Sequence, residues 1–211
     1  MGTTRRTGPS SGAATRKGMK TKDRIYTAAI ALIHEKGYET VTVPEICHAG
    51  GVSVGSFYHH FSSKKDLLAG YVREESDRLF EFYRGLGDRP PLEALFLTLH
   101  EFFSYFAVKG QDFVGTFFSI MLSSRGEYFH PADFALYEII EESLRRAEEE
   151  GTLTGSLPLS LLRDLLTGGI WQLMVEWCTA EGEPDLQETA DRHLKRFQEL
   201  LAGAIKGSGS V

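Results

Sequence analysis

The spacing of the apolar residues constrains the fold of this chain more than any other feature. From Lys22 to about residue 204, apolar side chains recur every three or four positions, and strand-like alternation extends over no more than a few residues. This period places the apolar residues on one face of an α-helix. Gly or Pro interrupts the pattern where helices must end. The sequence therefore predicts an all-α protein of about nine helices, at residues 22–36, 43–50, 54–60, 63–86, 92–108, 111–124, 132–150, 158–180 and 184–204.

Two of these predicted helices are short and are separated by a glycine-containing turn. Thr42 stands three residues before Glu45, which is the spacing of a capping box that begins a helix. Gly50-Gly51 ends this helix, and Ser53 is a favourable first residue for the next one. A short helix, a turn and a second short helix form the helix-turn-helix arrangement, whose second helix enters the major groove of DNA.

The second short helix has distinct inner and outer residues. Phe57 and Phe61 are four positions apart and are expected to face inward with Ile46 and Val52. The remaining residues then point outward, where small side chains permit close approach to base edges and polar ones donate to bases or phosphates. Thr42 and Lys64, at the starts of two helices, are expected to contact phosphate. The predicted DNA-binding residues are Thr42, Val54, Gly55, Ser56, Tyr58, His59 and Lys64.

One pattern joins the capping signal, the turn and the aromatic pair at fixed spacing: Thr42-Val43-x-x-Ile46, followed by Gly51-Val52-Ser53-x-Gly55-x-Phe57-Tyr58-x-His60-Phe61-x-Ser63-Lys64-x-x-Leu67. In this pattern, over about residues 22–70, the sequence resembles the TetR family of one-component transcriptional regulators. Only Cys47 and Gly50 depart from the usual pattern, at positions where Ala is common. The resemblance implies an all-α homodimer whose C-terminal domain binds a small molecule and so alters the separation of two recognition helices.

Charge divides the chain into two parts. Residues 1–66 hold 10 Lys and Arg against 5 Asp and Glu, a net charge of +5, whereas residues 67–211 hold 13 against 24, a net charge of -11. The basic part suits a polyanionic partner. We therefore expect a disordered basic arm at 1–18, a helix-turn-helix domain at 19–66, an effector-binding and dimerisation domain at 67–205, and a flexible tail at 206–211.

Several classes of protein do not fit the sequence. The longest apolar stretches without charge are shorter than the roughly 20 residues of a membrane span, and the N-terminus lacks the apolar core of a secretory signal. Cys47 and Cys178 are far apart, and no cluster has the spacing of zinc ligands. No phosphate-binding glycine loop or nucleophile motif is present. We expect a cytoplasmic protein with no metal, no cofactor, no membrane partner and no catalytic residues.

Aromatic residues are unusually dense between residues 92 and 137. They fill the helical core or, together, line an apolar cavity for a small molecule. Polar residues on the same helices and on the helix at 158–180 are candidates to orient such a ligand. The predicted effector-binding residues are His100, Phe103, Phe106, Phe117, Met121, Arg125, Trp171 and Gln172.

The last two predicted helices are candidates for a dimer interface. The helix at 158–180 is apolar nearly all round, and the last helix has apolar residues at coiled-coil spacing. Two copies of this pair would form a four-helix bundle across a twofold axis. Alternatively, both helices only complete the core of one chain. The predicted interface residues are Leu162, Leu165, Gly169, Leu173, Leu194, Phe197 and Leu201.

Together these features predict a sequence-specific DNA-binding transcriptional repressor. A homodimer would bind a palindromic operator in double-stranded DNA and leave it when a small apolar or amphipathic effector binds the C-terminal domain. The helix at 63–86 is shared by both domains and is the expected lever. Two alternatives remain at this point, an effector-independent DNA-binding protein controlled by a protein partner and an enzyme that uses the C-terminal pocket.

Overall fold

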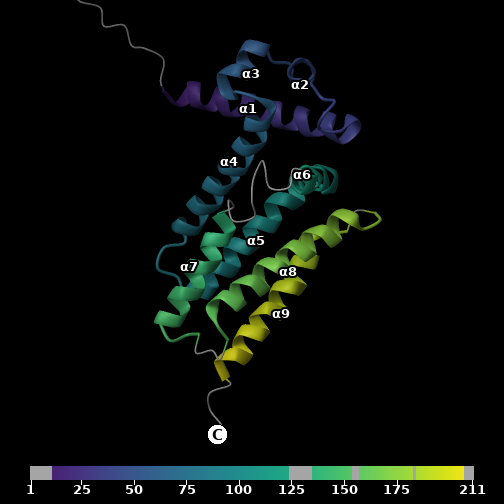
Figure 1. Cartoon of the computed structure of the whole chain (residues 1–211). Helices are drawn as coiled ribbons and strands as arrows, with labels where there is room; N and C mark the ends of the chain where they lie inside the picture. The colour runs from purple at the N-terminus through teal and green to yellow at the C-terminus, as the bar shows by residue number, and fades with distance from the viewer. Residues whose placement is uncertain (1–10, 124–134, 154–156, 183, 207–211) are drawn as a thin grey trace, which may run out of the picture. The chain divides into compact units, whose positions relative to one another are not determined.

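The computed structural model of the chain describes residues 11–123, 135–153, 157–182 and 184–206. Within these ranges the fold is all-α, as predicted, and contains nine helices and no strand (Figure 1). Eight of the nine begin within three residues of the predicted start. The helices are α1 (Ser11–Lys36), α2 (Val43–Gly50), α3 (Val54–His60), α4 (Lys64–Gly85), α5 (Pro91–Lys109), α6 (Gln111–Ser123), α7 (Ala135–Glu149), α8 (Leu159–Thr179) and α9 (Leu186–Lys206).

The first helix differs from the prediction at its start. α1 begins at Ser11 rather than Lys22, so residues 11–18, expected to be part of a disordered arm, are helical. This stretch mixes four residues of high helix propensity with two glycines, which disfavour a helix. It extends a helix that already exists, and such an extension needs no new nucleation. Residues 1–10 of the predicted arm and residues 207–211 of the predicted tail lie outside the described residues.

The chain divides into two compact units between Leu68 and Ala69, a point that lies within α4. In the first unit, α1 packs against α2, and α2 packs against α3. The core of this unit includes Ile25, Ile46 and Phe57, none of which exposes any side-chain surface. Phe57 and Phe61 face inward as predicted, with their ring centroids 5.6 Å apart.

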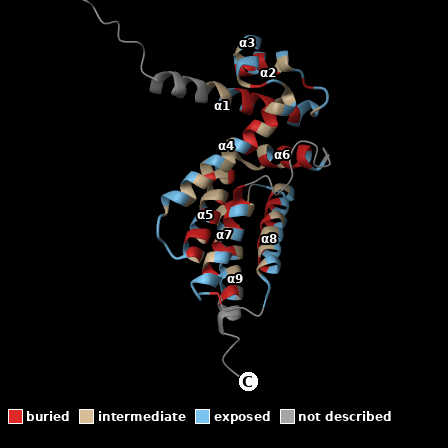
Figure 2. Cartoon of the chain, turned by 60° about the vertical axis from the view of Figure 1, so that its left-hand side comes forward, coloured by how far each residue is buried: buried red, intermediate tan, exposed pale blue. Residues whose placement is uncertain are grey.

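The second unit is a helical bundle around α5. This helix packs against α6, α7 and α9, while α8 packs against α6, α7 and α9. Leu95, Leu99 and Phe103 of α5 are fully buried, and Figure 2 shows buried residues along the facing sides of these helices. The second unit thus has its own hydrophobic core.

The packing of α8 against α9 depends on a glycine, Gly169, at the point where the two helices meet. A Cβ atom at Gly169 would overlap the ring of Phe197, with Cε2 only 2.9 Å away. The neighbouring Gly168 has open space where its Cβ would be. The mid-helix glycine at position 169 therefore makes room for an aromatic ring of the same chain.

Each unit contains one free cysteine. Cys47 is buried in α2, and Cys178 in α8 is partly buried with its Cβ 3.7 Å from the position that a Cβ of Gly115 would occupy. Burial raises the pKa of both thiols, to about 11 at Cys178. In the described ranges, no helix is long and apolar enough to cross a membrane, and no group of three or more potential ligands could hold a metal ion.

Candidate DNA-binding and effector sites

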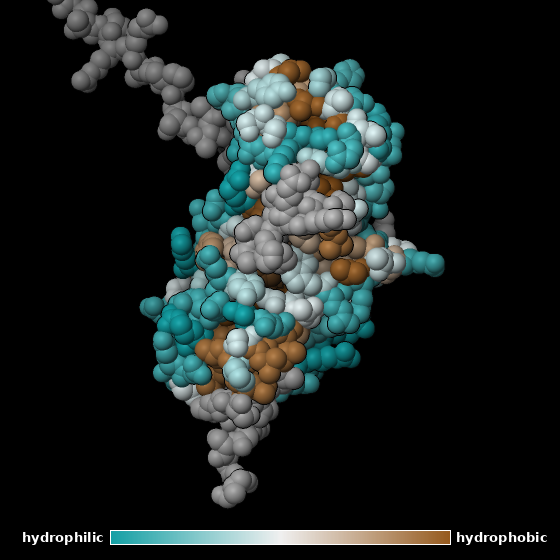
Figure 3. All heavy atoms as spheres, in the orientation of Figure 1, coloured by the Kyte–Doolittle hydropathy of each residue, from teal (hydrophilic) through white to brown (hydrophobic). Residues whose placement is uncertain are grey.

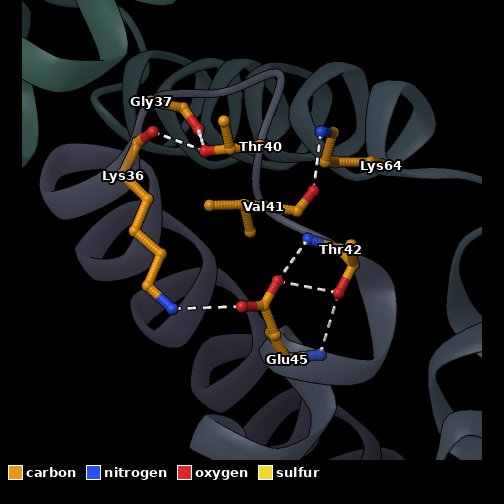
Figure 4. Close-up of polar contacts among 7 residues, drawn as sticks. All are labelled: Lys36, Gly37, Thr40, Val41, Thr42, Glu45 and Lys64. Carbon is orange, nitrogen blue, oxygen red and sulfur yellow. Dashed lines mark hydrogen bonds and ion pairs between the residues drawn. The ribbon is translucent and has the colours of Figure 1, made fainter.

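The start of α2 is held by the capping box that the sequence predicts. The Thr42 amide and hydroxyl both donate to Oε2 of Glu45, at 2.9 and 2.8 Å, and the Glu45 amide donates to the Thr42 hydroxyl at 3.4 Å (Figure 4). The Thr42 hydroxyl proton is therefore already used by Glu45. A phosphate contact by this hydroxyl, as the sequence led us to expect, would require it to leave that carboxylate.

Glu45 also connects α2 to the end of α1. Nζ of Lys36 lies 3.0 Å from Oε1 of Glu45. The hydrogen bonds from the side chain and backbone of Thr42, followed by the one from Lys36, lower the pKa of the Glu45 carboxyl to about 2. Glu45 thus fixes the start of the helix-turn-helix from both sides.

Lys64, at the start of α4, binds the backbone of the segment that connects α1 to α2. Its ammonium donates to the carbonyl oxygens of Tyr38 and Val41, the latter at 2.8 Å, and lies 4.1 Å from the centroid of the Tyr38 ring. Burial lowers its pKa. An ammonium has three N–H donors, so two are used within the chain and the third is available for the predicted phosphate contact.

The turn between α2 and α3 is built around Gly51. Its φ of 59° is in the left-handed region, and its amide and that of Val52 donate to the carbonyls of His48 and Cys47. Nη2 of Arg24 in α1 donates to the Gly51 carbonyl at 2.7 Å. A Cβ at position 51 would lie 2.5 Å from that nitrogen, so both the backbone conformation and the space require glycine.

The outer face of α3 carries five of the seven predicted DNA-binding residues, while Thr42 and Lys64 lie at the starts of α2 and α4. Val54 and Tyr58 are 42% and 56% exposed, Gly55 and His59 are exposed, and Ser56 is half-buried. The Ser53 hydroxyl accepts from the Ser56 amide at 3.0 Å and so caps the helix. The structure thus presents a short capped helix with small residues at its N-terminal end and aromatic donors beyond them.

The second unit contains a small cavity between α4, α5, α6 and α7, which is partly open to solvent. Its volume is about 20 Å³, which is roughly the room that one water molecule needs. The large preformed cavity that the aromatic density suggested is therefore not present at this place. The aromatic rings fill the space themselves, for example Phe102 and Phe106 with ring centroids 4.8 Å apart. The lining residues are Tyr71, Val72, Glu75, Ser76, Arg78, Leu79, Phe102, Tyr105, Phe106, Phe117, Ala135 and Leu136.

Four of the lining residues form a hydrogen-bonded network, which we call the polar wall: Tyr71, Glu75, Arg78 and Tyr105. The Tyr105 hydroxyl donates to Glu75 and lies 3.0 Å from the Tyr71 hydroxyl. Nε of Arg78 donates to Glu75 at 3.0 Å, and its guanidinium carbon lies 4.1 Å from the Tyr105 ring centroid. Burial is the main reason why the pKa of Tyr105 is raised, so the phenol stays protonated.

The predicted effector-binding residues separate into four groups. Phe106 and Phe117 line the cavity, and Phe103, Met121 and Trp171 pack between helices. His100 and Gln172 are exposed on the surface, and Arg125 lies outside the described residues. Sequence reasoning missed the polar wall. Its signal was the spacing of Tyr71, Glu75 and Arg78, which places all three on one face of a helix.

Most of the predicted interface residues face the core of their own chain. Leu162, Leu173, Leu194 and Leu201 are buried, so they are not available to a second copy, and Gly169 and Phe197 pack on each other. The reason is that α8 presents one side to α6, α7 and α9. On its other side it exposes what we call the α8 stripe, which is Leu161, Leu165, Gly168 and Val175. Figure 3 shows apolar surface over the lower part of α8.

The sequence of this chain is similar to those of known bacterial regulatory proteins. The model of the family described as "Bacterial regulatory proteins, tetR family" matches residues 25–71, which include all of α2 and α3. Among curated proteins, the HTH-type transcriptional repressor KstR2 of Rhodococcus jostii is 28% identical over 202 residues, covering 92% of this chain and 96% of the relative. KstR2 of Mycobacterium tuberculosis is 25% identical over 193 residues, covering 89% and 94%.

Solved structures share the fold over most of the chain. The fatty acid degradation regulator FadR of Bacillus halodurans superposes with a TM-score of 0.71 at 20% identity, covering 92% of this chain and 96% of that one. FadR of Thermus thermophilus, a transcriptional repressor solved in complex with lauroyl-CoA, has a TM-score of 0.60 at 26% identity and covers 84% and 93%.

Proposed function

We propose that the chain is a transcriptional repressor of the TetR family, which binds a palindromic operator as a homodimer; the match of residues 25–71 to the model of that family and the likeness to the repressor KstR2 support this. An amphipathic effector bound in the second unit releases the repressor from the DNA. The observation that carries this proposal is the outer face of α3, a capped helix that presents its exposed residues as a recognition helix does.

The DNA contacts follow from the chemistry of this face. Val54, Gly55 and Ser56 allow the start of α3 to approach base edges, and the tyrosine and histidine that follow reach bases or phosphates. Thr42 and Lys64 contact phosphate at the starts of α2 and α4. The Thr42 hydroxyl must leave the Glu45 carboxylate to do so, whereas Lys64 uses its third N–H. The tight turn at Gly51 sets the angle between α2 and α3.

For the effector we propose a molecule with a long apolar chain and a polar head, of the acyl-CoA class. The support is the likeness to Thermus thermophilus FadR, which was solved with lauroyl-CoA, together with the aromatic lining of the cavity in the second unit. Because the volume of this cavity is only about 20 Å³, the aromatic side chains must move apart to admit a chain. An effector that binds the open arrangement more tightly shifts the population toward it. The helix α4 lines this cavity and also begins in the first unit, so it is the lever of the release.

The homodimer is proposed to form through the α8 stripe. Apolar residues with more than two fifths of their surface exposed, repeated along one side of a helix, are typical of a subunit interface. A twofold axis beside α8 would bring the same stripe of a second copy into contact with it.

The experiment that tests the DNA-binding proposal starts from random double-stranded DNA. The purified protein is expected to select a palindromic site, whose affinity is then measured by fluorescence anisotropy. Tyr58→Phe removes one hydroxyl from the exposed face of α3 and should weaken binding about tenfold, which is typical of a lost hydrogen bond to a charged group. Tyr137→Phe, a matched change in the second unit, should leave the affinity unchanged.

Two results would contradict the proposal. One is the absence of any selected sequence, and the other is an equal affinity of the Tyr58→Phe and Tyr137→Phe proteins for the selected site. Release is tested separately by adding lauroyl-CoA to the complex with DNA, with free CoA as the control. Release by lauroyl-CoA alone supports an effector of this class, whereas equal release by both or by neither contradicts it.

A further inference from the structure

We propose that Arg78 binds the anionic group of the effector, at the side of the cavity that meets solvent. The ligand is a chain molecule whose head is an oxygen anion, a carboxylate or a phosphate, and whose apolar end is turned inward. This inference rests on the proposed function, in which the effector enters this cavity. It goes further because it assigns the head group to one residue and gives the chain a direction.

The lining of the cavity is apolar where it is buried and charged where it is exposed. Apart from Tyr71, the buried lining residues are all apolar, whereas both charged lining residues, Glu75 and Arg78, are partly exposed. The exposed fractions of these two side chains are 20% and 34%. An amphipathic molecule therefore fits with its apolar end inward and its head beside these side chains. The buried apolar lining residues are Val72, Leu79, Phe106, Phe117, Ala135 and Leu136.

Arg78 has more hydrogen-bond donors than its partners in the chain use. Of the five N–H groups of a guanidinium, one on Nε donates to Glu75 at 3.0 Å and one on Nη1 donates to Glu101 at 2.7 Å. Among the described residues, the other three, two of which are on Nη2, have no acceptor. Hydrogen bonds from a guanidinium to an anionic oxygen are about twice as strong as those between neutral groups. Arg78 can thus bind an anionic head without releasing either glutamate.

The charges around Arg78 balance, so an entering anion meets no net negative charge. Glu75 and Glu101 both pair with Arg78. The second positive charge is Lys109, whose Nζ lies 5.1 Å from the ring centroid of Tyr105, the tyrosine that donates to Glu75. Two carboxylates and two cations thus form a cluster without net charge. Because Arg78 is partly exposed, a head group bound to it also keeps part of its hydration, which lowers the cost of binding.

A cationic head group fits this site less well, although aromatic rings line it. The ring of Tyr105 already has two cations against it, with the guanidinium carbon of Arg78 at 4.1 Å and Nζ of Lys109 at 5.1 Å from its centroid. Nζ of Lys109 also lies 6.0 and 5.6 Å from the centroids of Tyr71 and Phe113. A third cation at these rings would be close to two like charges. The free position beside Arg78 therefore favours an anion over a cation.

The experiment compares chain molecules that differ only in the head group. The probes are decanoate, decyl phosphate, 1-decanol and decyltrimethylammonium, and binding to the full chain is measured by calorimetry at pH 7 without DNA. At least one of the two anions should bind about tenfold more tightly than 1-decanol, the factor expected for a hydrogen bond to a charged group. The tighter of the two anions distinguishes a carboxylate head, as in a free fatty acid, from a phosphate head, as in an acyl-CoA.

Three variants connect this ranking to Arg78. Glu101→Gln removes one carboxylate from Arg78 without changing the lining, so the anions should bind severalfold more tightly and 1-decanol as before. Glu93→Gln is the matched control, because this carboxylate of α5 pairs with Arg89 instead, and it should change neither affinity. Arg78→Lys replaces the planar guanidinium by an ammonium with three donors, so the preference for the anions should fall severalfold. The comparison of the two glutamate variants is informative even if the Arg78→Lys protein does not fold.

The inference is overturned if both anions bind no more tightly than 1-decanol, or if decyltrimethylammonium binds most tightly. It is also overturned if Glu101→Gln and Glu93→Gln change the affinity for the anions equally, or if a folded Arg78→Lys protein keeps the full preference. These failures differ from a failure of the proposed function, because they are measured without DNA. A protein that prefers the anions but selects no operator would contradict the repressor proposal and leave the role of Arg78 in place.

Discussion

Glu45 holds three points of the first unit at once, the amide and hydroxyl of Thr42 and the ammonium of Lys36. Its carboxyl has a pKa of about 2, below its ordinary value of 4.5. A lowered pKa means that the folded state favours the ionised form. The contribution of Glu45 to stability is therefore complete above pH 4.5 and is lost as the pH falls toward 2.

Glu45→Gln tests this pH-dependent contribution to stability. The variant should be less stable than the wild type at pH 7, and the difference should disappear as the pH approaches 2. The measurement is the free energy of unfolding from denaturant titrations at several pH values. Glu35→Gln, at an exposed carboxylate in the last turn of α1, is the control and should show a smaller pH dependence. A difference between Glu45→Gln and wild type that stays constant down to pH 2 would contradict the assignment.

The two adjacent glycines of α8 offer a second test at the residue scale. Because Gly168 lies in the α8 stripe, both variants are compared in the Leu165→Asp background, where no second copy covers it. There Gly168→Ala places a methyl group in open space and should stabilise the helix by up to about 1 kcal/mol. Gly169→Ala must displace the Phe197 ring, and overpacking of this kind costs about 1–3 kcal/mol. The Gly169→Ala protein should thus have the lower melting temperature. Equal melting temperatures would show that the ring moves aside without cost.

At the scale of the element, α3 has only seven residues and depends on its surroundings for its helical form. Ser53→Ala removes the side-chain cap and should destabilise the first unit by about 1 kcal/mol. Operator affinity should fall, because the outer face of α3 becomes less ordered. Ser53→Thr keeps a hydroxyl and should preserve most of the affinity. Equal affinities of the alanine and threonine variants would contradict a role for the cap.

The helix ends show how much of the fold could be predicted from the sequence. The ends of α2 and α3 were predictable because Thr42, Gly51 and Ser53 form caps that depend on local chemistry alone. The start of α1 was not, because residues 11–18 have no apolar period and include two glycines, so neither their pattern nor their helix propensity indicated a helix. The period of apolar residues predicts that a helix exists but needs a second signal to locate its end.

The two candidate sites also differ in how well the sequence predicted them. The outer face of α3 follows from the inward-facing Phe57 and Phe61, which the sequence shows directly. The cavity depends on which faces of α4, α5, α6 and α7 meet, and this is decided by packing between residues far apart in the chain. The sequence therefore suggested His100 and Gln172 as polar residues that orient the ligand, but both lie on the surface. It did not indicate Glu75 or Tyr105, which line the cavity.

At the scale of the whole molecule, the α8 stripe predicts the oligomeric state. Leu165→Asp places a charge in the middle of the proposed interface and should convert the dimer to a monomer. Light scattering at micromolar concentration measures the mass. Val108→Asp changes a residue of α5 that is 87% exposed and lies outside the stripe, so it should leave the dimer intact. A wild-type protein that is monomeric under these conditions would contradict the interface.

Each unit contains one cysteine whose reactivity can report the local opening of that unit. Cys47 and Cys178 are both shielded, and with raised pKa values they are mostly unreactive thiols at neutral pH. A thiol reagent can therefore modify each one chiefly when its surroundings open, so the labelling rate at each position reports the local opening of one unit. Peptide mass analysis distinguishes the two sites in a single sample. The local opening of the first unit and that of the second can thus be followed separately in the native chain, with no residue introduced for labelling.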